Sequence, residues 1–590
     1  MRKFFVLNTF VLLSILFSIA MPQKNLVETF KNPDKTFYPW IYWYWLNGNI
    51  NEDGLIADLE AMDDAGIGTA MAFDVGIGVP GKVTVRSEEW YRLMKKVILK
   101  ADELGMRIGF NCPGWANAGG PWITPENAMK ELTWTELCVN ADSKNIQLPK
   151  APDRLNFYKD IAVLAYPSLE GDEFSLNNQN CQIADTLGNV IADYDKLLDN
   201  NRDTWIKLPG FFDVILDKPQ EIRSMQVRAS NIADSRFFVA NMWYYDESAK
   251  KFKYVVNIPG SPSGLNDRPG MGTASFSPVK AKKFRFGFMI GYGNKSKYSK
   301  EIYLQELNIQ GSHRIPCWHN KTGFGHNSFE DYSVKVTRHD VINPNSIINI
   351  TDKMDANGNI SWNVPDGNWT IVRLGYIPTG AMTQPLNKGL NALECDKYSK
   401  KASKVQFEGV MQPLFDLVGK DVANRVFANY HIDSYEVGWQ NWSECIPEEF
   451  KHRRGYDMNK YLLALTGRAV SSVDETNAFL WDFRRTMADC YADNHIGYIT
   501  ELAHQNGMKF SIEAYDGPFE DLQTAGRTDM PMSEIWQKSD PDSRPRSAAM
   551  FAAHIYDRKL VGTEQFTGMG FWDLHPWVMK TILMLVLLMV

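Results

Sequence analysis

Cysteine is scarce in this 590-residue chain, and charge of one sign never accumulates. Its seven cysteines are scattered, odd in number and without a Cys-x-x-Cys pair, so the sequence supports neither a disulfide framework nor a zinc site. The 63 Lys and Arg residues nearly balance the 70 Asp and Glu residues, for a net charge of -7. Because phosphate backbones attract concentrated positive charge, this balance argues against nucleic acid as the main partner.

Long apolar runs are also rare, and the clearest one is at the beginning. Residues 1–20 read Met-Arg-Lys, then a mainly apolar stretch from Phe4 to Phe17, then Ser18-Ile19-Ala20. A short basic start, a short apolar middle and small residues at the cleavage point are typical of a secretory signal peptide, the alternative being a membrane anchor. We therefore expect a periplasmic or secreted protein with no membrane span after cleavage.

The remaining composition is that of a globular protein, with 44% hydrophobic and 23% charged residues. At roughly 100 to 200 residues per domain, the length allows about three to six domains. The 32 Phe, 24 Tyr and 18 Trp residues are consistent with two uses, ordinary core packing and stacking on the faces of sugars or bases.

From residue 36, short apolar strands alternate with amphipathic helices, which predicts a parallel α/β architecture. We expect helices over residues 51–66, 87–105 and 474–507, and strands that begin near residues 39, 68, 106, 428, 508, 532 and 560. Seven strands are one short of an eight-stranded barrel. The sequence therefore predicts a TIM-type (β/α)8 barrel, complete or lacking its last strand, with inserted β-sandwich domains.

The insertions fall where the helical period is lost and turn residues are frequent. Three segments, Asp199 to Trp205, Phe212 to Leu216 and Lys283 to Phe288, resemble the galactose-binding-like jelly roll, and the loop from Asp199 to Thr204 is expected to hold a structural ion or to form only a turn. The predicted division is a signal peptide (1–20), the first part of the barrel (28–150), an inserted galactose-binding-like β-sandwich (151–330), a second small β-unit (331–375), the second part of the barrel (376–580) and an apolar tail (581–590).

The apolar tail has ten residues and cannot span a bilayer, which needs about 20. We expect either a truncated or frame-shifted end that omits the eighth strand, or a short buried strand.

Acidic residues at the strand ends are the candidate catalytic groups, because barrel enzymes place their chemistry there. Glu436 follows the fourth predicted strand and Glu564 ends the seventh, which lies opposite. Hydrolysis of an acetal needs a proton donor and a base or nucleophile, and two carboxyl groups provide both. The apolar neighbours Tyr435, Val437 and Trp439 favour protonated Glu436, so it is the candidate general acid. The alternative is that both glutamates are solvated or salt-bridged.

Other residues could bind a sugar in such a site. Asp433, His431 and His554 offer hydrogen-bonding groups, although a lone histidine is often a satisfied core residue. The indole rings that could wall the pocket are Trp43, Trp45, Trp115 and Trp439.

An ordered set of motifs resembles glycoside hydrolase family 106, the α-L-rhamnosidases, from about residue 28 to residue 580. The motifs are Pro39 to Gly48, Asp74 to Gly76, Asn111 to Trp115, Gly380 to Thr383, Glu394 to Lys397, Asp433 to Glu436 and Thr563 to Thr567. The resemblance implies a (β/α)8 catalytic domain with β-sandwich additions, an inverting mechanism and calcium in the active site. It makes Glu436 the general acid and Glu564 the general base, acting on rhamnose-containing oligosaccharides, polysaccharides or glycosides of plant type.

A hard cation such as calcium needs several oxygen ligands, and the cis hydroxyls of rhamnose could complete its shell. Glu513 and Glu534 are the predicted ligands, and the alternative is that they pair with Arg527 or Lys509. Two rival functions remain: a retaining barrel glycosidase of other specificity, with Glu564 as nucleophile, and an inactive truncated sugar-binding protein.

Overall fold

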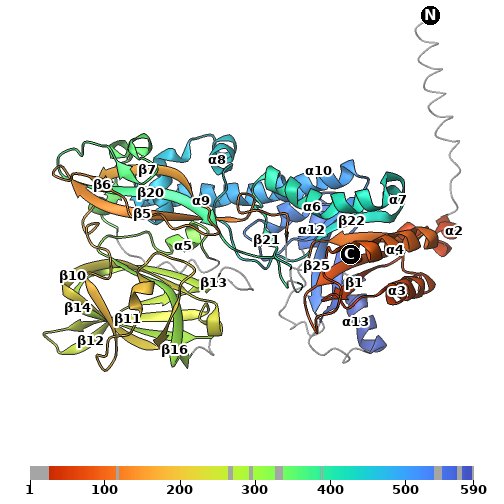
Figure 1. Ribbon diagram of the computed structural model, residues 1–590, viewed down its shortest axis with the longest axis horizontal. Helices are drawn as coiled ribbons and strands as arrows, with labels where there is room; N and C mark the ends of the chain where they lie inside the picture. The colour runs from red at the N-terminus through yellow and green to blue at the C-terminus, as the bar shows by residue number, and fades with distance from the viewer. Residues whose placement is uncertain are drawn as a thin grey trace, which may run out of the picture.

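The protein has three parts in the computed structural model: a parallel α/β sheet, a β-sandwich and a smaller antiparallel sheet beside the sandwich (Figure 1). The residues that the structure describes are 26–114, 118–262, 270–291, 297–325, 336–385, 387, 390–536, 548–567 and 575–587. The predicted signal peptide, residues 1–20, lies outside them.

The α/β sheet has seven strands, and all seven predicted strands are confirmed. They are parallel and follow the chain order β1 (Trp40–Leu46), β2 (Thr69–Val75), β3 (Arg107–Asn111), β22 (Phe427–Ile432), β24 (Lys509–Glu513), β25 (Met530–Trp536) and β26 (Gly562–Thr567). Within the described residues β1 and β26 are the two edges of this sheet, so a closed eight-stranded barrel is not present there. Because the strands are parallel, all seven carboxyl ends lie at the same end of the sheet.

Helices follow the strands, and their ends agree with capping rules. Asn51 and Ser87 accept hydrogen bonds from the backbone amides of Gly54 and Trp90, and Gly105 ends a helix with a φ of 64°. The helices of this part are α3 (Glu52–Asp64), α4 (Glu88–Leu104), α6 (Lys400–Val418), α7 (Lys420–Val426), α8 (Ile446–Arg454), α9 (Val473–Cys490), α10 (Tyr498–Gln505), α11 (Asp521–Ala525) and α12 (Ala548–Ile555). A π-helix over Tyr491–Gly497 joins α9 to α10, so the predicted tract over 474–507 is helical throughout most of its length.

The sandwich is antiparallel and lies within the predicted insertion. Its strands are β8 (Cys181–Asp185), β9 (Ile206–Pro209), β10 (Phe211–Ala229), β11 (Phe238–Asp246), β12 (Lys251–Pro259), β13 (Ser261–Pro262), β14 (Gly270–Ile290), β15 (Lys297–Tyr298) and β16 (Glu301–Gln310). Alternate residues of these strands form a separate apolar core. In the loop before β9, Asp199 accepts hydrogen bonds from the Asn201 amide and the Thr204 hydroxyl, which is the turn that the sequence allowed.

The smaller sheet differs from the predicted unit at 331–375. It contains β5 (Lys130–Asn140), β7 (Lys159–Pro167), β18 (Ile348–Asn349) and β20 (Asn368–Pro378), so two of its strands come from segments assigned to the barrel and the sandwich. β5 pairs with β20 along its whole length, from Lys130 opposite Pro378 to Asn140 opposite Asn368. Such pairing joins strands more than 200 residues apart, and no local pattern announces it. Three two-stranded pairs complete the sheets: β4 (Gly119–Gly120) with β21 (Leu393–Glu394), β6 (Ile146–Gln147) with β19 (Asn359–Ile360), and β17 (Val341–Ile342) with β23 (Ala469–Val470).

Three further helices are α2 (Leu26–Lys31), α5 (Trp318–Lys321) and α13 (Pro576–Leu587). The expectation of a short buried strand in the apolar tail is wrong, because α13 takes in its first seven residues and leaves Leu583 and Met584 exposed. No helix of the described residues is both long and apolar enough to cross a membrane.

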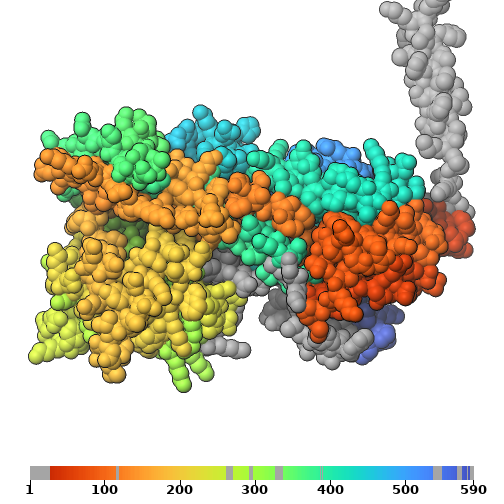
Figure 2. All heavy atoms as spheres, in the orientation of Figure 1, coloured from red at the N-terminus to blue at the C-terminus, as the bar shows by residue number. Residues whose placement is uncertain are grey.

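A buried cluster of charges joins the sandwich to the smaller sheet, which pack together in Figure 2. Glu131 of β5 is 6% exposed, and its carboxylate lies 2.8 Å from Arg202, 3.2 Å from Arg154 and 3.6 Å from Arg228 of β10. Three guanidinium groups thus share one buried carboxylate. Removing that carboxylate would leave the arginines partly uncompensated in a dry interface.

We predict that Glu131→Gln lowers the free energy of unfolding by about 3 to 5 kcal/mol, the range for breaking a buried ion pair. Urea unfolding followed by tryptophan fluorescence measures it. The matched control is Asp203→Asn. Asp203 also pairs with Arg154, but its side chain is 61% exposed, so this substitution should lower the free energy of unfolding by less than about 1 kcal/mol. Equal losses in the two variants would contradict a structural role for Glu131.

Candidate active site

Acidic side chains from four strands of the α/β sheet converge on one cavity. The cavity has a volume of about 1900 Å³ and runs along the inner face of the sheet. At its strand-end side it is lined by Asp433 and Glu436 after β22, Glu513 of β24, Glu534 of β25 and Glu564 of β26. Glu534 and Glu564 are directly paired in the parallel register, which puts their side chains on the same side of the sheet. Glu436 and Glu564, the two predicted catalytic residues, therefore line the same space.

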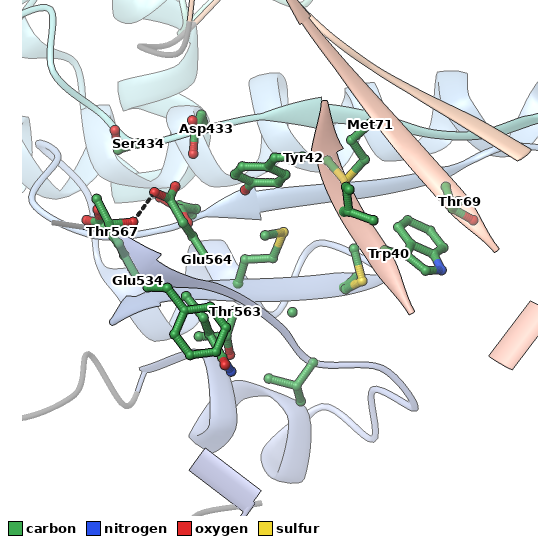
Figure 3. A pocket seen from close by; sticks show the side chains of 18 of the residues that line it. Trp40, Tyr42, Thr69, Met71, Asp433, Ser434, Glu534, Thr563, Glu564 and Thr567 are labelled. Atoms are coloured by element: carbon green, nitrogen blue, oxygen red, sulfur yellow. Dashed lines mark hydrogen bonds between the residues drawn. The ribbon is translucent and has the colours of Figure 1, made fainter. Parts of the chain in front are cut away.

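Three of these carboxyl groups are especially close. Asp433, Glu513 and Glu564 each offer an oxygen within 4.8 Å of the other two, and Figure 3 shows Asp433 facing Glu564. Burial, with the neighbouring negative charges, raises the pKa of Asp433 and the pKa of Glu513 well above their ordinary values. Asp433 Oδ1 and Glu513 Oε1 are buried without a hydrogen-bond partner. Like charges this close cannot all remain ionised, so the group needs protons or a bound cation.

Hydroxyl groups orient the carboxylates. The Tyr515 hydroxyl lies 2.6 Å from Glu513 Oε2 and 3.0 Å from Glu534 Oε2, and its single proton can be donated to only one of them at a time. The Thr567 hydroxyl donates to Glu564 Oε1, the contact dashed in Figure 3. The Ser434 hydroxyl donates to Glu436 Oε1 over 3.0 Å.

Burial raises the pKa of Glu564, the hydrogen bond from Thr567 opposes this rise, and the charges of Glu534 and Glu436 add to it; the net pKa is about 7. A carboxyl group with such a pKa can accept a proton near neutral pH.

The sequence neighbours expected to surround Glu436 are core residues. Tyr435, Val437 and Trp439 are each at most 8% exposed, and Tyr435 also lines the cavity. Glu436 itself lies on the cavity wall and is partly exposed. Its charge raises the pKa of both Asp433 and Glu564, so these two carboxyl groups are among its electrostatic neighbours.

His431 is a core residue that supports the site from behind. It is fully buried; its Nδ1 lies 2.7 Å from the Ser511 hydroxyl and its Nε2 lies 3.3 Å from the Tyr42 hydroxyl. Burial lowers the pKa of His431 to about 3, so the imidazole is neutral. Tyr42 stands between His431 and the cavity, which corrects the prediction that His431 contacts a sugar directly.

The predicted pocket walls Trp43 and Trp45 face the other side of β1. Trp43 donates to Asp58 of α3, and Trp45 packs edge-on against Trp90 of α4. The alternate residues Trp40, Tyr42 and Tyr44 line the cavity instead. Because successive side chains of a strand point to opposite faces, a one-residue error moves the whole set from the cavity to the core.

Three further predicted residues do not reach the cavity or are not described. Trp439 is 8% exposed and lies under the Arg484 guanidinium, which is 4.4 Å from its ring. His554 is on the exposed side of α12, not on a strand. Trp115 lies outside the described residues.

Of the two predicted metal ligands, Glu513 is in the close group of carboxylates, whereas Glu534 is tied to it through Tyr515. Neither alternative partner, Arg527 or Lys509, is placed to pair with these two glutamates. Arg527 donates to Asp493 over 2.9 Å, and Lys509 begins the strand that Glu513 ends, about 13 Å along it.

Cavity residues that were missed from the sequence include Tyr42, Tyr44, Tyr515 and Thr567. Tyr515 follows the strand-end acid Glu513 by two residues, and this position could have indicated that it lies in the cavity. Thr567 shares a side with Glu564 only because of a register shift after Ile535, with Phe566 at a φ of 71°.

A parallel α/β sheet with paired acids over one cavity at the strand ends is the arrangement of barrel-type glycoside hydrolases. The sequence matches the family of glycoside hydrolases 106, described as alpha-L-rhamnosidase, over residues 31–588. The chain belongs to this family.

Two relatives agree with this assignment. The rhamnosidase structure from Novosphingobium sp. PP1Y superposes with a TM-score of 0.80 at 26% sequence identity, over 96% of this chain and 55% of that one. A Formosa agariphila protein, named as a candidate beta-glucuronidase, is 30% identical over 583 residues, which are 97% of this chain and 38% of that protein. The chain therefore spans between about a third and about half of these relatives' lengths.

We predict that Glu564 makes stability fall with rising pH when divalent cations are absent. The folded chain holds a proton on Glu564 up to about pH 7, whereas the unfolded chain releases it near the ordinary pKa of 4.5, so the free energy of unfolding decreases between these values. Glu564→Gln should make this decrease smaller, because only the raised pKa values of Asp433 and Glu513 remain, and should exceed the wild type at pH 8 by up to about 3 kcal/mol.

Urea unfolding at pH 5 and pH 8 in the presence of EDTA measures the effect. Exposed Glu448 of α8 is the control, and Glu448→Gln should keep the pH dependence of the wild type. An unchanged slope in Glu564→Gln would show that other groups carry the dependence, with Asp433 and Glu513 the first to examine.

Proposed function

We propose that this chain hydrolyses α-L-rhamnosides with inversion, using Glu436 as general acid and Glu564 as general base. The observation that carries the proposal is that both residues, one after the central strand β22 and the other on the edge strand β26, line one cavity with three further carboxyl groups. Membership of the alpha-L-rhamnosidase family supports rhamnose as the sugar. The substrates would be rhamnose-containing oligosaccharides, polysaccharides or glycosides of plant type.

In this mechanism Glu564 takes a proton from the attacking water. Its pKa of about 7 suits a base at neutral pH, and the Thr567 hydrogen bond on Oε1 leaves Oε2 to face the water. Glu436 donates a proton to the leaving oxygen, and Ser434 holds one of its oxygens so that the other is presented to the cavity.

The charge of the cavity favours a neutral sugar over a uronate. Among its described lining residues the cationic side chains are Arg107 and Lys509, and both lie at the beginnings of strands, away from the carboxylates. A glucuronide would bring its own carboxylate to five acidic groups. This argues against transferring the glucuronidase name of the Formosa relative to this chain.

The same cavity fits the calcium that the family resemblance implies. Asp433 Oδ1 and Glu513 Oε1 are buried without partners, and closely spaced carboxylate oxygens are the ligands that Ca²⁺ prefers. Asp433 and Glu513 would hold the ion, with Glu564 beside it. When bound, calcium would neutralise the carboxylate charge and bind hydroxyl groups of the sugar.

The basic and apolar beginning of the sequence supports a location outside the cytoplasm. We therefore propose that the chain acts as a periplasmic or secreted enzyme.

The two glutamates should respond differently to substitution in assays of the purified chain. Glu564→Gln should lose more than about a hundredfold in kcat on p-nitrophenyl α-L-rhamnoside, because every substrate needs the base. Glu436→Gln should lose far more on methyl α-L-rhamnoside than on the aryl substrate, whose leaving group needs little protonation.

The configuration of the released sugar, read by NMR, should be inverted; a retained configuration would instead make Glu564 a nucleophile. Activity that survives in both variants rejects the assignment of the two residues. A folded wild type without activity on either substrate leaves a sugar-binding protein as the better description.

Calcium should raise the melting temperature of the wild type after EDTA treatment, because a ligand that binds only the folded state stabilises it by about 2.7 kcal/mol at a hundred times its Kd. Asp433→Asn and Glu513→Gln should abolish the rise, whereas Glu534→Gln should retain most of it. Loss of the rise in Glu513→Gln and Glu534→Gln but not in Asp433→Asn would favour the ligand set predicted from the sequence, and equal rises in all variants would place calcium elsewhere.

A further inference from the structure

The segment that carries Glu436 is irregular and yet buried. Between the end of β22 at Ile432 and the start of α8 at Ile446 there is no long strand or helix. Within 433–443 every residue is buried except Glu436, which is partly exposed on the cavity wall. Irregular segments normally run over the surface, because a buried one must find partners for its backbone and side-chain polar groups.

Gln440 supplies much of that bonding, and all of it reaches one neighbouring segment. Its Nε2 donates to Asp396 Oδ1 over 2.7 Å, and its Oε1 accepts from the backbone amide of Lys397 at 2.9 Å. Its backbone carbonyl accepts from the Tyr398 hydroxyl at 3.0 Å. The side chain is 1% exposed, so water does not replace these bonds.

The partner segment is itself fixed. Lys397 and Glu394 form an ion pair of 2.6 Å with both side chains at most 1% exposed. Asp396 also accepts from the amide of Tyr398 and from the Ser443 hydroxyl, which belongs to the Glu436 segment. Gln440 therefore bonds the segment to this fixed support through both the nitrogen and the oxygen of its side-chain amide.

Asn441 makes a second attachment in another direction. Its Oδ1 accepts from the amide of Leu132 at 2.8 Å, and its Nδ2 donates to the carbonyl of Thr322 over 3.0 Å. Its backbone amide donates to Lys130 of β5. The smaller sheet and the segment after the sandwich thus hold the residue next to Gln440.

We propose that Gln440 is a positioning residue for Glu436, holding the segment so that the carboxyl group reaches the leaving oxygen. The proposal rests on the proposed function of Glu436 as general acid. A displaced acid fails chiefly on substrates that need protonation, whereas a general loss of stability lowers activity on all substrates alike.

The test compares Gln440→Met, which keeps the volume of the side chain and removes its hydrogen bonds, with the full-length wild type. We expect kcat/KM to fall about tenfold or more further on methyl α-L-rhamnoside than on p-nitrophenyl α-L-rhamnoside. Gln305→Met is the matched control: Gln305 is 8% exposed, donates to the carbonyl of Arg202, and lies in the sandwich. It should leave the ratio of the two substrates unchanged. If Gln440→Met does not fold, Gln440→Asn, which shortens the amide by one carbon, replaces it.

Hydrogen exchange of residues 434–443 provides a readout that does not need activity. Exchange should be faster in Gln440→Met and unchanged in Gln305→Met. An unchanged substrate ratio overturns the positioning role, whatever the exchange shows. If the wild type hydrolyses neither substrate, the proposed function fails, and the holding role of Gln440 stands if exchange increases and falls if it does not.

Discussion

The close approach of carboxyl groups at the carboxyl ends of the parallel strands is the constraint on which the site depends. Parallel strands bring Asp433, Glu513, Glu534 and Glu564 together although they are widely spaced in the sequence. Burial of like charges raises the pKa values of Asp433, Glu513 and Glu564, so the folded chain must take up protons or a cation there. The burial and repulsion that weaken the fold also raise the pKa of Glu564 to about 7, where a carboxyl group can accept a proton at neutral pH.

The β-units act as supports of this site as well as separate folding units. The Glu131 cluster joins the sandwich to β5, and Leu132 of β5 donates to Asn441, five residues after Glu436. A continuous set of buried polar contacts therefore leads from the sandwich to the candidate acid. Each contact is short and satisfied at the Glu436 end, where mobility would displace a reacting group.

The strand order and the meeting of Glu436 and Glu564 at one cavity could be predicted because they depend on local patterns: apolar runs of strand length, and an acid where each run ends. The face of β1 could not, since Trp40 to Leu46 is aromatic or aliphatic at every position and its alternation has no polar marker. The sheet of β5, β7 and β20 depends on pairing between distant segments. The burial of His431 could not be predicted either, because its partners Ser511 and Tyr42 lie on other strands.

The backbone of β26 shows why the geometry around Glu564 is more specific than its sequence. Residues 564 and 567 would face opposite sides of a regular strand, yet the Thr567 hydroxyl reaches Glu564. The register shift places Thr567 opposite Trp536, and Phe566 takes a φ of 71°, a conformation that costs a bulky residue about 1 to 3 kcal/mol. This cost and the charge repulsion fall on the same strand end. The strained backbone and the charge repulsion therefore both lie beside Glu564. The packed core on the far side of the sheet must supply the compensating stability.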